Sequence, residues 1–124
     1  MKVLGLDHIV LNVEDVERSL AWYTQVLGLE AVRVELWRAG QAPFPSVRVD
    51  SRTIIDLLHA PNSGANMDHF CLVVSRSDVE AIVLDDRFAV LAGPGNRYGA
   101  QGEGWSVYVS DPDDNTVEFR SYAD

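Results

Sequence analysis

The sequence predicts an α+β fold made of two tandem modules, because one strand motif occurs twice. Residues 6–13 and 67–74 each place an Asp-His pair before a run of alternating, mostly apolar residues, 61 positions apart. Alternation with a period of two is typical of a β-strand with one buried face. A helical pattern and further strands follow each copy. A repeat of half the chain therefore predicts two copies of one supersecondary unit packed as a pseudo-symmetric pair.

The first module, residues 1–60, is predicted to contain one strand, a helix and three more strands. The helix is marked by apolar residues at spacings of four, three and four: Val16, Leu20, Tyr23 and Leu27. Gly28 ends this helix, because glycine tolerates the left-handed conformation that follows a helix. The three strands are predicted at residues 30–37, 46–49 and 53–58. Turn-forming residues then make 61–66 the linker between the modules.

The second module, residues 67–124, repeats this plan. Ser77 and Glu80 have the spacing of a capping box, and a short helix follows with an apolar face of Val79, Ile82 and Val83. A brief strand is predicted at 88–91 and a long irregular loop at 92–104, where five glycines and a proline occur. Strands at 105–110 and 116–122 then form a hairpin across the turn-forming residues 111–115.

Composition limits the possible functions. The 124 residues are 47% hydrophobic, which predicts a single globular domain over residues 1–124. The formal charge is −9, without a cluster of basic residues, and this argues against nucleic acid or an anionic membrane as a partner. No apolar run has membrane-spanning length and no signal peptide precedes the first strand, so we expect a cytoplasmic protein. The single cysteine, Cys71, is expected to be a buried apolar residue.

Matched positions of the repeat carry possible metal ligands. His8 and His69 open the two repeated strands, and Asp56 and Glu118 lie 62 positions apart in the last strand of each module. Each acid stands between two large apolar residues, so its side chain points to the opposite face of the sheet. We expect all four side chains to converge there. Two imidazoles with one or two carboxylates are typical of a site for zinc, iron, manganese or nickel.

Each of these residues also has a structural interpretation. A single histidine in an apolar strand is more often hydrogen-bonded structure than a ligand. Asp56 is alternatively an edge-strand charge, and Glu118 a salt-bridge partner of Arg120 or Arg48. Four possible ligands at two matched positions nevertheless favour the metal site. The third histidine, His59, has no counterpart in the repeat and is expected at the surface or in a pocket lining.

The sequence resembles the vicinal oxygen chelate superfamily, which includes glyoxalase I, extradiol dioxygenases, fosfomycin-resistance proteins and bleomycin-resistance proteins. The resemblance spans nearly the whole chain and rests on four motifs: DHIVL at 7–11, WYTQVLGLE at 22–30, MDHF at 67–70 and YVSDPDDNTVE at 108–118. It implies two βαβββ modules whose curved mixed sheets form a cleft, usually completed by a second subunit. We therefore expect a homodimer.

The resemblance also implies roles for single residues. His8, His69 and Glu118 match the two-histidine, one-glutamate metal triad of the family. Asp56 matches the fourth ligand of glyoxalase I, which is normally a glutamate and one methylene longer. Tyr108 matches a tyrosine near the metal of fosfomycin-resistance enzymes. We expect one divalent metal ion per site, with Glu118, Tyr108 and Asp56 as the catalytic residues.

The reaction within the superfamily stays open. A fourth carboxylate favours glyoxalase-type proton transfer beside a carbonyl, whereas a triad with three open positions favours an Fe(II) extradiol dioxygenase. A fosfomycin-type transferase also fits the triad. We expect a metal-dependent lyase or isomerase acting on a small oxygenated molecule, whose substrate pocket is formed by Arg97, Tyr98, Trp105 and Arg120. The alternative from another class is a non-catalytic ligand-binding protein of the bleomycin-resistance type.

Overall fold

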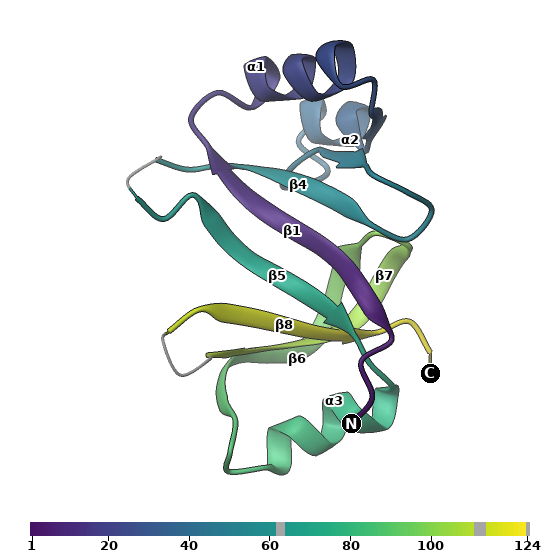
Figure 1. Cartoon of the computed structure of the whole chain (residues 1–124), viewed down its shortest axis with the longest axis vertical. Coiled ribbons are helices and arrows are strands. Elements are labelled where there is room, and N and C mark those ends of the chain that lie inside the picture. The colour runs from purple at the N-terminus through teal and green to yellow at the C-terminus, as the bar shows by residue number, and fades with distance from the viewer. Residues whose placement is uncertain (62–63, 111–113, 124) are drawn as a thin grey trace. The chain divides into compact units, whose positions relative to one another are not determined.

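A computed structural model describes residues 1–61, 64–110 and 114–123 of the chain (Figure 1). The α+β class is confirmed, since a strand, a helix and three strands follow one another twice, with η1 and α2 added in the first half. The first half contains β1 (Gly5–Val13), α1 (Val16–Ala21), η1 (Trp22–Val26), β2 (Glu30–Val32), α2 (Val34–Arg38), β3 (Ser46–Arg48) and β4 (Ile54–His59). The second half contains β5 (Met67–Val73), α3 (Arg76–Leu84), β6 (Ala89–Gly99), β7 (Gly102–Ser110) and β8 (Thr116–Ser121). In the described part of the chain, no helix has the length and apolar character needed to cross a membrane.

The chain divides into two compact units, which are described separately here. The terminal unit consists of residues 1–8 and 69–124, and the central unit consists of residues 9–68. The boundary therefore passes through β1 directly after His8 and through β5 directly before His69. Both repeated histidines consequently belong to the terminal unit, together with Glu118.

The central unit has the strand order β2-β3-β4-β1, with antiparallel pairing from β2 to β4. Helix α1 begins at Asp15, whose carboxylate accepts a hydrogen bond from the backbone N–H of Arg18 at 3.0 Å. The helix continues into the π-helical turn η1, and Gly28 follows with a φ of 73°, as predicted for a helix end. The core of this unit contains Val16, Leu20, Val47 and Leu57.

The predicted strand over residues 30–37 is wrong beyond residue 32. Arg33 adopts a left-handed conformation with a φ of 59°, and α2 follows instead of more strand. Val34 and Trp37, three residues apart, pack against the core of the central unit, while Leu36 is 41% exposed. The apolar residues of this segment therefore follow a helical spacing and not the alternation of a strand.

The terminal unit has the strand order β5-β8-β7-β6. β5 and β8 are parallel, and the other two pairs are antiparallel. Helix α3 packs on one face of this sheet, where the core consists of Val74, Val79, Ile82, Val107, Val109, Val117 and Phe119. The predicted strands of this half are confirmed, although the predicted turn at 111–115 lies partly outside the described residues.

The irregular loop predicted at 92–104 is also wrong, because β6 runs through most of it. β6 is the edge strand and pairs with β7 as far as Gly99 and Gly102, with register shifts between Val90 and Gly95. An edge strand has one side free of ladder hydrogen bonds, and β-bulges absorb irregular residues. These features explain why a segment rich in glycine, with Pro94, is still a strand.

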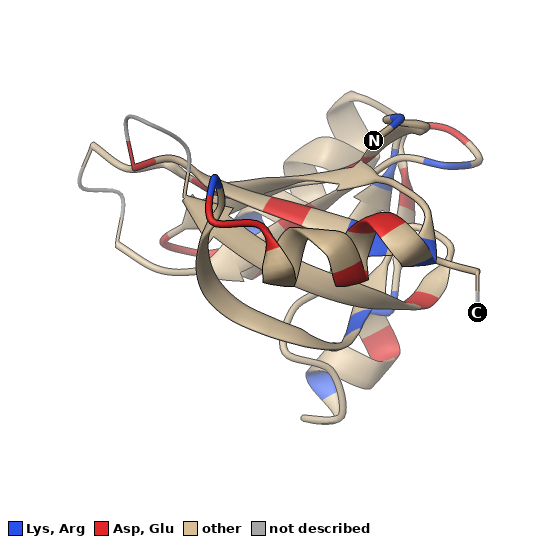
Figure 2. Ribbon diagram, turned by 90° about the horizontal axis from the view of Figure 1, so that it is seen from below, with Lys and Arg blue, Asp and Glu red and all other residues tan. Residues whose placement is uncertain are grey.

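Helix α3 shows how surface charge is arranged in the terminal unit. Figure 2 shows both acidic and basic positions along α3 and the turn that follows it. Arg76 pairs with Glu80 at 3.1 Å, and Arg87 pairs with Asp85 at 2.6 Å. The cap of α3 differs from the prediction: Ser75, and not Ser77, accepts a hydrogen bond from the backbone N–H of Asp78, at 3.1 Å.

The cap of α3 gives a stability prediction. Ser75→Ala should lower the free energy of unfolding by about 1 kcal/mol, because it leaves a helix N–H without its acceptor. Ser77→Ala is the matched control, since its hydroxyl contacts only the Ser75 hydroxyl, at 3.0 Å, and it should cost much less. Urea unfolding measures both variants. An equal loss for the two serines would contradict this assignment of the cap.

Candidate metal centre

Three side chains from three strands of the terminal unit meet at one point. His8 lies at the end of the β1 segment of this unit, His69 lies in β5 and Glu118 lies in β8. The Nε2 atoms of His8 and His69 are 3.3 Å apart, and Oε1 of Glu118 lies 3.2 Å from the first and 3.0 Å from the second. The structure brings together these three of the four residues that were expected from the sequence to converge.

Strand alternation explains this convergence. In β8, Val117 and Phe119 belong to the core beneath α3, so Glu118 and Arg120 point to the opposite face. In β7, Val107 and Val109 likewise belong to that core, which puts residues 106 and 108 on the face of Glu118. The sheet thus has one apolar face covered by a helix and one face that carries the polar side chains.

His8 is oriented by the residue that precedes it. The carboxylate of Asp7, which is fully buried, lies 2.7 Å from Nδ1 of His8. A carboxylate only accepts hydrogen bonds, so Nδ1 carries a proton; Nε2 donates to Glu118 in the metal-free protein and would present its lone pair once a metal displaces that proton. Asp7 also accepts hydrogen bonds from the Tyr122 hydroxyl at 2.5 Å and from the Ala100 backbone N–H at 3.0 Å. Burial opposes the charge of Asp7, but these hydrogen bonds hold its pKa below the usual value.

Hydrogen bonds to the second carboxylate oxygen, Oε2, fix the orientation of Glu118. Oε2 accepts a hydrogen bond from the Ser106 hydroxyl at 2.8 Å and from Arg120 at 3.0 Å (Nη2) and 3.1 Å (Nε). Burial opposes ionisation of Glu118, yet hydrogen bonds to His69 and His8 and the charge of Arg120 keep its pKa far below the usual range. Oε1 is therefore directed, as a charged oxygen, toward the two imidazoles.

The donor set fits a divalent transition metal. Ligand atoms about 2.0–2.2 Å from zinc, at angles between octahedral and tetrahedral values, lie roughly 3.0–3.4 Å apart, and the three distances here fall in that range. Neutral imidazole nitrogen and ionised carboxylate oxygen are the atoms that such metals bind. The exposed fractions of the side chains of His8, His69 and Glu118 are 2%, 11% and 1%. The group thus reaches solvent on the side of His69.

Tyr108 lies beside this group. Its ring contacts the His69 ring edge to face, with centroids 5.3 Å apart. Burial and the neighbouring Glu118 charge raise the pKa of Tyr108 well above its usual value. The phenol therefore keeps its proton at neutral pH, and the catalytic role of Tyr108 stays a prediction.

The four predicted pocket residues have different surroundings. Arg120 is fully buried and binds Glu118, which bears out the salt-bridge interpretation of that pair. Arg97 lies over the Tyr108 ring at 5.9 Å, and Tyr98 is 37% exposed. Trp105 lies on the α3 side instead, where its Nε1 donates to Glu80 at 3.0 Å and Arg76 stacks on its ring. The structure therefore does not bring Trp105 to the triad.

Asp56 lies in the central unit and is fully buried. Its Oδ1 accepts a hydrogen bond from the Ser46 hydroxyl at 2.5 Å and lies 3.6 Å from Nη2 of Arg33. Asp56 is thus a buried residue of β4 and not an exposed edge-strand charge. Its role as a fourth ligand or a base stays a prediction.

Cys71 and His59 follow their predicted environments. Cys71 is fully buried, and burial raises the pKa of its thiol well above the usual value, so it is a poor nucleophile. Its sulfur, together with Asp7 and His8, forms a second possible ligand group. Asp7 and the Nδ1 side of His8 are already hydrogen-bonded to each other, which favours the triad. His59 is exposed in the central unit.

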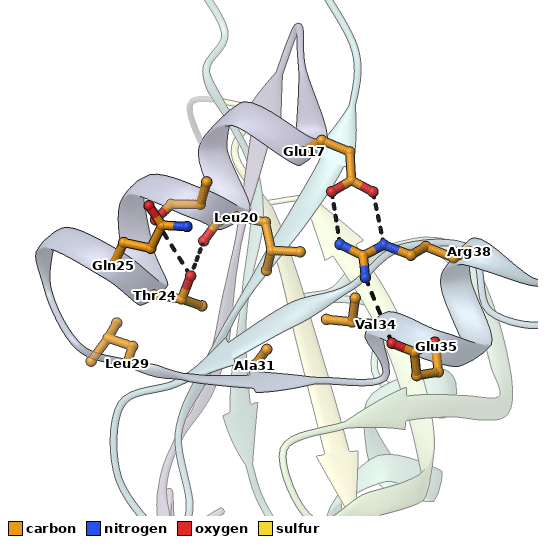
Figure 3. A pocket seen from close by; sticks show the side chains of 10 residues that line it. Glu17, Leu20, Thr24, Gln25, Leu29, Ala31, Val34, Glu35 and Arg38 are labelled. Atoms are coloured by element: carbon orange, nitrogen blue, oxygen red, sulfur yellow. Dashed lines mark hydrogen bonds and ion pairs between the residues drawn. The ribbon is translucent and has the colours of Figure 1, made fainter.

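The central unit also contains a pocket of about 560 Å³ between α1, η1, β2 and α2 (Figure 3). Its rim carries an exposed ion pair between Glu17 and Arg38, with both hydrogen bonds at 2.9 Å. The Thr24 hydroxyl donates to the backbone carbonyl of Leu20 at 2.8 Å. None of the lining residues is a histidine or cysteine, so this pocket lacks the donor set of the triad.

Sequence reasoning missed three polar residues that support the triad: Asp7, Ser106 and Tyr122. For Asp7 a signal existed, since both copies of the repeat place an aspartate directly before the histidine. The alternation in β7 put Ser106 on the same face as Tyr108. For Tyr122 no comparable signal existed, because its contact with Asp7 joins residues 115 positions apart.

The sequence was compared with known proteins. Residues 5–119 match the sequence model of the glyoxalase/bleomycin resistance protein/dioxygenase superfamily. The chain is 30% identical to virulence protein STM3117 of Salmonella typhimurium, covering 94% of this chain and 83% of that protein. It is 29% identical to the glyoxalase domain-containing protein RDO1 of Mycosarcoma maydis, covering 100% of this chain and 72% of that protein.

Solved structures show the same fold. Methylmalonyl-CoA epimerase from Mycobacterium tuberculosis aligns with a TM-score of 0.69 at 19% identity, covering 98% of this chain and 90% of that one. The Mn(II)-bound glyoxalase from Novosphingobium aromaticivorans aligns with a TM-score of 0.68 at 23% identity, covering 97% and 39%. At these identities the likeness shows the fold alone.

The ionised Glu118 gives a pH prediction for the metal-free protein. Its folded-state pKa lies below the usual 4.5, so its contribution to stability is complete above that pH and is lost as the pH falls toward the folded-state value. Glu118→Gln should therefore lose less stability between pH 7 and pH 3 than the wild type, measured by urea unfolding. Glu103→Gln, an exposed control, should follow the wild type. Parallel curves for wild type and Glu118→Gln would refute the assignment.

Proposed function

Because the chain belongs to the glyoxalase/bleomycin resistance protein/dioxygenase superfamily, we propose that it is a divalent-metal-dependent enzyme with glyoxalase-like chemistry. The substrate is a small oxygenated molecule, and the reaction is a lyase or isomerase step through an enediolate. The observation that carries this proposal is the triad of His8, His69 and Glu118, with ligand atoms 3.0–3.3 Å apart. The protein acts as a homodimer, as proposed from the family.

The residues of the chain have distinct roles in this proposal. His8, His69 and Glu118 would hold the metal ion, which would supply a Lewis acid for negative charge on substrate oxygens. Tyr108, protonated beside His69, donates a hydrogen bond to an oxygen on which charge develops. Asp56 is the proposed base that removes a proton from the carbon beside the carbonyl. Asp7 keeps the Nδ1 proton on His8 so that Nε2 stays a ligand.

Metal analysis tests this proposal directly. Protein purified without a chelating tag should bind about one equivalent of manganese, iron, nickel or zinc, and His69→Ala should abolish that binding together with activity, because it removes one ligand of three. His59→Ala removes a histidine outside the triad and should bind like the wild type. Elemental analysis of the three proteins measures the content.

Two results would contradict the proposal. Unchanged metal content in His69→Ala would exclude the triad as the site. A metal-free protein that still binds a small ligand would support the bleomycin-resistance type of binding protein. With metal bound, the preferred ion decides whether lyase or dioxygenase activity is assayed first.

The Asp-His repeat supplies a sharper pair of variants. Asp7→Asn should weaken metal binding about 10- to 100-fold, because the amide is a poorer acceptor for the Nδ1 proton of His8. Asp68→Asn changes the equivalent residue of the other copy, which is exposed, and should leave the affinity unchanged. Titration of the metal-free proteins with Mn²⁺ measures both. Equal Mn²⁺ affinities for the wild type and both variants would show that Asp7 does not support the metal site.

A further inference from the structure

We propose that Arg97 binds an anionic group of the substrate, which makes the substrate a small oxygenated molecule with a carboxylate or phosphate beyond its two metal-binding oxygens. The inference rests on the proposed function, because it assigns a substrate class to the same site. It depends on three features of Arg97: how its guanidinium is held, which charges surround it, and how its backbone is joined to the triad.

The guanidinium of Arg97 has a defined position on the polar face of the sheet. Its Cζ lies 5.9 Å from the centre of the Tyr108 ring, and its Nη1 donates to the backbone carbonyl of Asn96 at 2.8 Å. Gly95 leaves room for it, since a Cβ at Gly95 would lie 2.9 Å from Nη1. The side chain is therefore positioned by neutral groups only.

Arg97 also differs from the other arginines of the terminal unit in its charge environment. Arg76, Arg87 and Arg120 each form an ion pair, with Glu80, Asp85 and Glu118 respectively. Within residues 1–61, 64–110 and 114–123, no acidic side chain forms an ion pair with Arg97, which is exposed. A guanidinium binds carboxylate and phosphate through paired N–H groups, so this charge is available to a ligand.

The position of Arg97 is coupled to the metal ligands. Nη2 of Arg120 donates to the backbone carbonyl of Arg97 at 3.2 Å and to Oε2 of Glu118 at 3.0 Å. On the side-chain side, the Tyr108 ring contacts both the guanidinium and the His69 ring. Arg120 and Tyr108 therefore each contact both Arg97 and one residue of the triad. A ligand held at the triad would extend past Tyr108 to reach this charge.

Three 2-hydroxy acids separate the contribution of Arg97 from that of the metal. Lactate, malate and 3-phosphoglycerate share the carboxylate and hydroxyl pair, but malate adds a carboxylate and 3-phosphoglycerate adds a phosphate. Calorimetric titration of the Mn²⁺-loaded wild type should show about tenfold tighter binding of at least one of these two anions than of lactate, as expected for a charge-assisted hydrogen bond. The tighter of the two identifies the anionic group.

The variants test whether Arg97 causes this preference. Arg97→Gln should remove the preference for malate or 3-phosphoglycerate over lactate and leave the lactate affinity unchanged. Gly95→Ala keeps the charge but displaces the guanidinium, so it should reduce the preference several-fold. Arg87→Gln, which removes an exposed charge paired with Asp85, should keep it. The inference is overturned if Arg97→Gln keeps the preference for malate or 3-phosphoglycerate over lactate, or if the wild type shows no such preference. Neither result affects the metal proposal.

A metal-free measurement distinguishes failure of the metal proposal from failure of this inference. If the wild type binds no metal, the proposed function fails, and propionate and inorganic phosphate are titrated into the metal-free protein while the side-chain Nε–H signals are followed by NMR. A saturable shift of the Arg97 signal, with none for Arg87, supports an anion site at Arg97. The absence of such a shift overturns the inference.

Discussion

The buried carboxylate of Glu118 is the group on which the polar face of the terminal unit depends. Its two oxygens have separate partners: Oε1 lies between the imidazoles of His8 and His69, and Oε2 accepts hydrogen bonds from Ser106 and Arg120. A buried charge is tolerated only when it is paired, and removal of one partner of a buried ion pair typically costs about 3–5 kcal/mol. The ion pair with Arg120 therefore stabilises the charged form of Glu118, and it directs Oε1 toward the two imidazoles.

Two networks of hydrogen bonds support the triad from opposite sides. Arg120 and Ser106 hold Glu118, whereas Asp7 holds His8 and is itself held by Tyr122 and the Ala100 backbone. The two networks are joined, because Nη1 of Arg120 also donates to the Tyr122 hydroxyl at 3.2 Å. Every polar group in this chain of contacts is fixed by another protein group. The geometry of the three ligand atoms is thus a property of the folded chain.

The histidine repeat, the strands and the acid at Glu118 were predictable because each follows a local rule. The repeated strands alternate with a period of two, and alternation alone sends Glu118 to the face opposite Phe119. The errors occurred where tertiary structure overrides the local pattern. Glycines and a proline predicted a loop at 92–104, but an edge strand accommodates them. Residues 34–37 form a helix instead of a strand, and Val34 and Trp37, three residues apart, pack against the core. The Tyr122 contact with Asp7 depends on the complete fold, which no sequence spacing encodes.

The acids in the last strands of the two copies have similar surroundings, whereas the aspartates before the two histidines do not. Asp56 and Glu118 are both buried, and each accepts a hydrogen bond from a serine and faces an arginine. The aspartates that precede the histidines differ, since Asp7 is fully buried and Asp68 is exposed. The buried Asp7 carboxylate therefore fixes the tautomer of His8. The sequence repeat thus supplies matched residue types, whereas the surroundings of those residues differ between the two copies.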